Sequence, residues 1–195
     1  KVADNATINL TDALNISENF RTSDRRWIGE AYTDLTRLSE PAVVSESVFN
    51  GRQLTIVNYE NITIKGGVNS RIVVDPAYAF VLNFVNCTNI TIENLTMGHT
   101  VEGYCTGGVI GLTNSSAITI KSCDLYGCGA YGIVSQESPF LMEKSIIRDC
   151  SYGIMQLYGV SYAEFNECDF FRNREFSMVE IDGNSSNIQF NHCRF

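Results

Sequence analysis

Side chains that could do chemistry gather in one glycine-flanked stretch of the sequence. The stretch "GHTVEGYCTGG", at 98–108, contains His99, Glu102 and Tyr104. A histidine can transfer a proton, and a carboxylate can act as an acid or base or bind a cation. His99 and Glu102 are therefore candidate catalytic residues, and with Tyr104 they form a candidate ligand site. The structural alternative is that His99 donates a hydrogen bond that ties down a loop.

The elements that would position these residues follow from a repeat. An alternation of apolar and polar residues recurs along the chain, with copies that begin 22 to 28 residues apart. Examples are "NITIENLTM" at 89–97, "AITIKSCDL" at 117–125 and "NIQFNHCRF" at 187–195. Alternation with a period of two inside such a repeat indicates stacked β coils. A leucine-rich repeat would need leucine and asparagine at fixed offsets and a helical half, and neither is found.

We therefore predict an all-β fold, a right-handed parallel β-helix, over residues 51–195. It would be a single-stranded solenoid of about five to seven coils, because one coil alone buries little apolar surface. The asparagines of the "NITI" segments are expected in turns. The coil that starts at Ile90 is longer than later coils, and its extra residues fall between Met97 and Val109, so the candidate stretch is expected to be a protruding loop.

Stacking would add Asp75 to the candidate site. Asp75 and Glu102 lie at similar offsets, 13 and 12 residues after the first apolar position of their coils. Equal offsets in adjacent coils come side by side, about 4.8 Å apart. The two carboxylates are weak candidates for a Ca²⁺ site, and no other cofactor is expected.

The cysteines predict a buried ladder rather than a set of disulfides. The chain has seven cysteines, an odd number, and no Cys-x-x-Cys spacing. Cys123, Cys168 and Cys193 share one column of the stack with Leu95 and Ser145. Cys128 and Cys150 share a second column with Thr100 and Asn173. Free cysteine suits such columns as a small buried hydrophobe, and one oxidised pair of column neighbours remains an open alternative.

Residues 1–50 are expected to be an N-terminal flank with one irregular insertion, at 15–50, that contains a short helix near 30–38. The insertion holds Trp27, the single tryptophan, in "RRWIGEAY". Trp27 is expected to pack on the stack; the alternative is a ligand platform with Arg25 or Arg26. The sequence stops at Phe195 in the middle of the pattern, so we expect a piece of a longer protein, because an uncapped stack would expose a strand edge.

The overall charge limits the possible partners. The formal net charge is −8, which argues against nucleic acid, because phosphate binding needs a basic surface. It also disfavours polyanionic sugars unless Ca²⁺ bridges the like charges. No apolar run approaches the roughly 18 residues of a membrane-spanning helix, so no membrane span is predicted.

The region 51–195 resembles the pectate-lyase-like superfamily of β-helices. The phrases "NGRQLTIVNYENITIKG", "GHTVEGYCTGGV" and "DLYGCGAYGI" also resemble a set of bacterial exported β-helix proteins with no established activity. The resemblance implies a carbohydrate ligand, such as a polysaccharide or cell-surface glycan. It also implies an extracellular or cell-envelope location. Trp27 and Asp75 then join His99, Glu102 and Tyr104 as expected ligand-binding residues.

The catalytic patterns of that superfamily are largely missing. Polygalacturonases carry Asn-Thr-Asp, Asp-Asp, Gly-His-Gly and Arg-Ile-Lys segments, and this sequence has only "GHT" at 98–100. The arginine motif of pectate lyases is absent too. The sequence therefore predicts a non-catalytic, carbohydrate-associated module that is exported or displayed on a cell surface. The alternative is a polysaccharide-cleaving enzyme, a lyase rather than a glycoside hydrolase.

Overall fold

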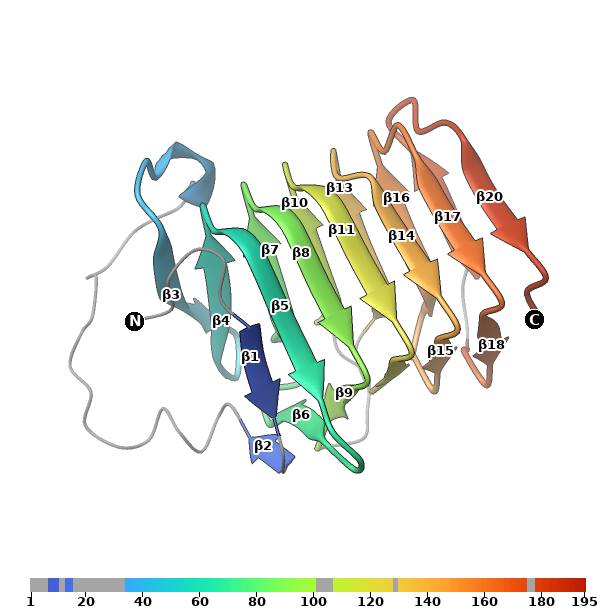
Figure 1. Ribbon diagram of the computed structural model, residues 1–195, viewed down its shortest axis with the longest axis horizontal. Helices are drawn as coiled ribbons and strands as arrows, with labels where there is room; N and C mark the ends of the chain where they lie inside the picture. The colour runs from blue at the N-terminus through green and yellow to red at the C-terminus, as the bar shows by residue number, and fades with distance from the viewer. Residues whose placement is uncertain (1–6, 11–12, 16–33, 101–106, 128–129, 175–177) are drawn as a thin grey trace.

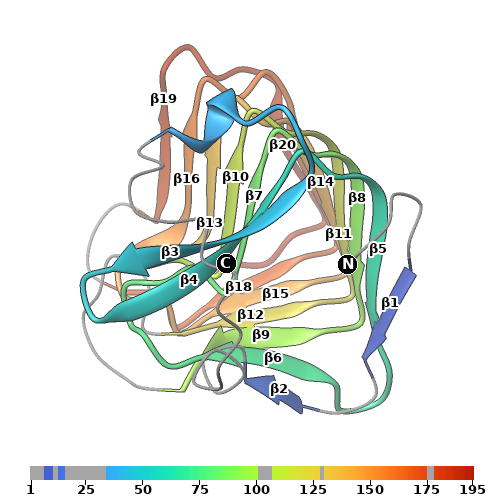
Figure 2. The same cartoon turned by 90° about the vertical axis from the view of Figure 1, so that its left-hand side faces the viewer.

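The computed structural model describes residues 7–10, 13–15, 34–100, 107–127, 130–174 and 178–195. The chain winds through three sheets that form the sides of a three-sided prism (Figures 1 and 2). We name them sheets A, B and C. Every strand pairs in parallel with the equivalent strand of the next coil, apart from one antiparallel pair, β3 and β4, in the described residues. The predicted parallel β-helix is confirmed.

Each coil contributes one strand to each side of the prism. Sheet A contains β1 (Thr7–Leu10), β5 (Glu60–Gly66), β8 (Thr88–Glu93), β11 (Ser116–Lys121), β14 (Phe140–Glu143), β17 (Ala163–Asn166) and β20 (Ile188–Asn191). Sheet B contains β2 (Ala13–Asn15), β6 (Arg71–Val74), β9 (Thr96–His99), β12 (Asp124–Tyr126), β15 (Ile146–Arg148) and β18 (Asp169–Phe171). Sheet C contains β3 (Ala42–Val48), β4 (Gly51–Val57), β7 (Leu82–Val85), β10 (Ile110–Thr113), β13 (Tyr131–Gln136), β16 (Gly153–Tyr158) and β19 (Val179–Asp182).

The core consists of columns of apolar side chains that run along the prism. The register aligns Ile90 with Ile118 and Ile118 with Phe140, and all three are buried. Because side chains alternate along a strand, the residues between them, such as Thr91 and Thr119, face outward. The apolar residues of the alternating sequence pattern therefore point into the prism, and the polar residues between them point outward.

The corners of the prism depend on residues in the left-handed region. Asn58, Asn86 and Asn114 have φ of 58°, 53° and 47° where sheet C leads into sheet A. Asn94 and Ser122, with φ of 55° and 52°, turn the chain from sheet A to sheet B. Asparagine adopts this region at low cost because its short polar side chain bonds locally. The prediction that the asparagines of "NITI" lie in turns is wrong at Asn61 and Asn89, which lie within β5 and β8, where each has a φ of 56°.

Coil length varies mainly at one corner. From sheet A to sheet B the equivalent positions are nine residues apart in the first full coil, from Ile62 to Arg71. They are six residues apart in the next two coils, from Ile90 to Thr96 and from Ile118 to Asp124. From sheet B to sheet C the step is eight residues from Leu125 to Ile133 but 13 from Met97 to Ile110. The long coil therefore places its extra residues between β9 and β10, as the sequence predicted.

The N-terminal flank is partly regular. β1 and β2 pair with β5 and β6 and so continue sheets A and B. The expectation of an irregular segment up to residue 50 is wrong for Ala42–Val48, which forms β3 antiparallel to β4. The short helix expected near 30–38 is, in the described residues, one 3-10 turn at Leu35–Arg37. β3 extends sheet C at its edge, and its Val44 packs with Leu35, Val57 and Val85 in a second small apolar cluster.

The predicted thiol column is present. Cys123 and Cys168 are buried, Cys193 is half-buried, and all three are free thiols. Each Sγ donates to a carbonyl of the preceding coil; that of Cys168 lies 3.5 Å from Met142 O. Burial raises the pKa of Cys123 and of Cys168 to about 11, so both remain protonated donors at neutral pH.

Removing the most buried of these thiols tests the packing of the column. Cys168→Ala should lower the free energy of unfolding by roughly 1–3 kcal/mol, because it leaves a cavity and removes the hydrogen bond from Sγ to Met142 O. Cys193→Ala, at the half-buried position of the same column, should cost clearly less. Urea unfolding followed by circular dichroism measures both, and equal losses would contradict the inward placement.

A second variant tests the left-handed corners. Asn94 is exposed with φ of 55°, so Asn94→Val should lower the free energy of unfolding by about 1–2 kcal/mol through backbone strain. Asn94→Gly should be close to neutral, because glycine adopts positive φ freely. Chemical unfolding of the two variants provides the comparison, and equal stability would show that the corner has another conformation.

Candidate functional site

His99, the central residue of the predicted site, is inside the prism. It is 4% exposed, because the alternation that places Met97 in the core also points His99 inward. Its Nε2 donates to Ala79 O at 2.8 Å. A Cβ at Gly127 would come within 2.4 Å of Nδ1, so the ring fills the space beside that glycine. This geometry fits the structural alternative for His99, in which its ring donates a hydrogen bond that holds the chain in place. The acceptor, Ala79 O, belongs to the preceding coil.

The protonation state of His99 agrees with this placement. Burial lowers its pKa below the ordinary value of 6.5 and outweighs the opposing hydrogen bond to Ala79. Its Nδ1 has no hydrogen-bond partner in the described part of the chain. The ring is therefore neutral at pH 7, with the proton on Nε2.

Asp75 lies at the surface beside the next coil. The register places it against Thr100, whose hydroxyl donates to Asp75 Oδ1 at 2.8 Å. Asp75 and His99 are therefore brought into neighbouring coils, one outside the core and one within it. Glu102, Tyr104 and Trp27 lie outside the described residues, as do Arg25, Arg26 and Cys128, so their roles stay predictions.

The calcium prediction is likewise untested, since it needs Glu102. Among the residues that the structure describes, no group of three or more histidine, cysteine or acidic side chains could hold a metal ion.

A groove on the outer face of sheet C is a site that the sequence reasoning missed. It has a volume of about 750 Å³ and crosses β13, β16 and β19, within the range of roughly 300–1,000 Å³ typical of small-ligand sites. The strands present their outward residues in ranks, one from each coil. One rank is Val134, Gln156 and Glu180; the next is Gln136, Tyr158 and Asp182.

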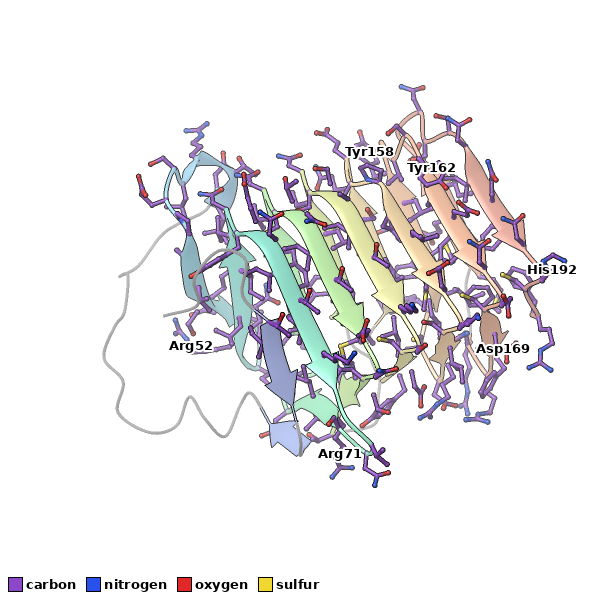
Figure 3. The ribbon with its side chains drawn as sticks, in the orientation of Figure 1. Arg52, Arg71, Tyr158, Tyr162, Asp169 and His192 are labelled. Atoms are coloured by element: carbon purple, nitrogen blue, oxygen red, sulfur yellow. The ribbon has the colours of Figure 1, made fainter. Side chains whose placement is uncertain are left out.

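The polar groups of this groove are held by one another. Gln156 Nε2 donates to Glu180 Oε2 at 2.8 Å. Burial raises the pKa of the Tyr131 hydroxyl above its ordinary value, and a hydrogen bond to Glu180 raises it further. The hydroxyl therefore stays protonated and can donate a hydrogen bond. Tyr158 is the most exposed aromatic residue of the groove, at 51%, and stands at the upper edge of the molecule in Figure 3. The groove thus has fixed hydrogen-bonding groups beside an open aromatic ring.

A smaller hollow of about 310 Å³ continues the groove toward sheet B. It shares Val134 and Gln156 with the groove and adds Phe80, Tyr131 and Tyr152. The Tyr131 and Tyr152 rings are 6.3 Å apart. We call the two hollows together the sheet C groove.

The predicted loop ends near this aromatic end. A Cβ at Gly107 would lie 2.3 Å from Ala79 O, and one at Gly108 would lie 2.5 Å from the Phe80 ring. Gly107 and Gly108 directly follow the undescribed residues 101–106. The sequence signal for the groove was the outward position that holds Val134 in "YGIVSQ", Gln156 in "YGIMQL" and Glu180 in "FSMVEI".

Three sheets around an apolar core, with a groove on one outer face, define a β-solenoid. Residues 47–195 match the family model described as the right-handed beta helix region. The chain belongs to this family.

Two known proteins are similar to this chain. The capsule K1-specific depolymerase of Klebsiella phage K64-1 is 28% identical over 147 residues, which are 69% of this chain and 16% of that protein. The crystal structure of a protein from Parabacteroides merdae, described as a candidate glycosyl hydrolase, is 14% identical. It superimposes with a TM-score of 0.55 over 75% of this chain and 80% of that one. At this identity the likeness shows the fold alone.

None of the helices in the described residues is long and apolar enough to cross a membrane.

The buried histidine predicts a stability change with pH. The unfolded chain takes up a proton on His99 near pH 6.5, whereas burial delays protonation in the folded protein. The neutral ring of His99 therefore contributes to the free energy of unfolding above pH 6.5. This contribution is lost as the pH falls, by at most about 1.4 kcal/mol per pH unit. His99→Gln should lack this part of the loss between pH 7.5 and pH 5.5 in urea unfolding.

His192→Gln is the matched control. The chain has only these two histidines, and His192 is exposed, so its ring is hydrated in both the folded and the unfolded protein. The control should keep the wild-type pH dependence. A wild-type dependence in His99→Gln would place the acid sensitivity elsewhere.

Proposed function

We propose that this chain is a carbohydrate-binding module of an exported or cell-surface protein, and that it binds a glycan along the sheet C groove without cleaving it. The observation that carries the proposal is the exposed Tyr158 ring, set in a groove among Gln136, Gln156 and Glu180. The names of the two similar proteins, a capsule depolymerase and a candidate glycosyl hydrolase, support a glycan as the partner.

The chemistry of the groove suits a sugar chain. The apolar face of a pyranose packs on an aromatic ring, while its hydroxyls need donors and acceptors at the edge. Tyr158 provides the ring. The amide groups of Gln136 and Gln156 provide both donors and acceptors, and the Glu180 carboxylate accepts from two hydroxyls. An open groove also admits a long polymer, which an enclosed cavity would exclude.

The remaining predicted residues extend this proposal. Asp75 is at the surface, and Glu102 and Tyr104 belong to the predicted loop, whose last residues, Gly107 and Gly108, lie beside the aromatic end of the groove. A bound glycan that continues past Phe80 would reach this corner of the prism. The assignment of Asp75, His99, Glu102, Tyr104 and Trp27 to glycan binding stays a prediction, and the burial of His99 gives it a supporting rather than a contacting position.

One observation favours the alternative, a polysaccharide-cleaving enzyme. Glu180 and Asp182 project from the same face of β19, so the structure holds two carboxylates in one groove. Residues two apart on a strand are separated by roughly 6.5–7 Å, which is compatible with an inverting hydrolase. Asp182 Oδ1, however, accepts from Gly183 N at 2.7 Å, which turns this carboxylate toward the backbone and favours the binding role.

A pair of tyrosine variants tests the proposed function. Tyr158→Ala should weaken glycan binding by about 10-fold or more, since loss of a stacked ring costs roughly 1–3 kcal/mol. Tyr162→Ala is the matched control, because Tyr162 is 37% exposed and lies near Tyr158 in Figure 3 but does not line the groove. Calorimetry with a polysaccharide panel measures binding, and circular dichroism verifies the fold.

The same panel separates binding from cleavage. The module should release no new reducing ends and no unsaturated products from a glycan that it binds. Cleavage that is lost in Glu180→Gln would establish the enzyme. Equal binding by Tyr158→Ala and Tyr162→Ala, or no binding to any glycan of the panel, would contradict the proposed groove.

A further inference from the structure

The charges of the sheet C groove have one sign. Among the described residues that line its two hollows, Glu180 and Asp182 are acidic, and no lysine, arginine or histidine is present. The hydrogen-bond partners of Glu180 are neutral, the Gln156 amide and the Tyr131 phenol. The described lining of the groove therefore has two carboxylates and no basic side chain.

The arginines of the neighbouring side are already engaged. Arg148 bonds Asp124 at 2.8 Å and Asp149 at 2.8 Å on sheet B. Arg194 bonds Asp169 on the same side, and Asp169 lies toward the right-hand end of the molecule in Figure 3, well below Tyr158. These cations are paired with carboxylates and lie on a different side of the prism from the groove. They do not offset the charge of Glu180 and Asp182.

We infer that the sheet C groove selects an uncharged glycan, built of neutral hexose or N-acetylhexosamine units, and rejects glycans that carry uronic acid or sulfate groups. This inference rests on the proposed function and names the class of ligand for the same site. A neutral sugar donates its hydroxyls to the two carboxylates, which are then satisfied. A carboxylate or sulfate group on the sugar would lie beside the carboxylates of Glu180 and Asp182, and like charges in close contact repel each other.

The test uses two polymers that differ only in charge. Polygalacturonate and the same polymer with its carboxylates reduced to hydroxymethyl groups have one backbone and one linkage. Neutral glucans, mannans and chitin oligosaccharides complete the panel. In low salt without Ca²⁺, we expect the wild-type protein to bind a neutral member, and the acidic form of a matched pair at least about 10-fold more weakly. Added salt should narrow this difference by screening the repulsion.

Charge-neutralising variants connect the selectivity to the groove. Glu180→Gln combined with Asp182→Asn should raise affinity for the acidic polymer several-fold and lower affinity for the neutral one, because two acceptors are lost. Glu167→Gln is the control for loss of a carboxylate away from the groove, since Glu167 is exposed at the corner between sheets A and B. It should change neither affinity.

The outcomes separate the inference from the proposed function. Tight binding of the acidic polymer that Tyr158→Ala abolishes would keep the groove as a glycan site but overturn the charge selection. Binding only of a cationic glycan such as chitosan, with no neutral member bound, would overturn it as well. Glycan binding that is unaffected by Tyr158→Ala would overturn both proposals. Preference for the neutral polymer, lost in the double variant and kept in Glu167→Gln, would establish the inference.

Discussion

Backbone hydrogen bonds between equivalent strands of successive coils are the constraint on which this structure depends. They fix the spacing of the coils at about 4.8 Å. Each side chain of a strand can then point only into the core or out to the surface. A shift of one residue in any coil would exchange its two faces. The buried column of Ile90, Ile118 and Phe140 therefore fixes the outward positions as firmly as it fixes the core.

The sheet C groove is a direct product of this register. Gln156 comes to lie beside Glu180, and Tyr158 beside Asp182, although each pair is separated by 24 residues. The side chains gain order from their neighbours, as in the hydrogen bond from Gln156 to Glu180. A ligand thus meets groups that are already held in place, so less entropy is lost on binding.

The sequence predicted the fold because the core imposes a period that can be read directly. It placed Asn61 and Asn89 in turns, whereas both lie within β5 and β8 in the left-handed conformation that asparagine adopts at low cost. The outer face has no such requirement, so the groove with Gln156 and Glu180 left no periodic signal strong enough to recognise. His99 was assigned to a surface site because chemistry was weighed before alternation; counting from Met97 would have placed it inside.

The corner between sheets B and C is a place where the connecting segment can vary in length and composition. The step between those sheets ranges from eight to 13 residues, yet the strands on both sides keep their register. Extra chain at this corner is therefore uncoupled from the phase of the core. Segments of different length and composition can be exchanged there beside the groove, so recognition can diverge between relatives while the scaffold and its folding energy stay constant. The segment between sheets B and C can therefore change without any change in the strands that it connects.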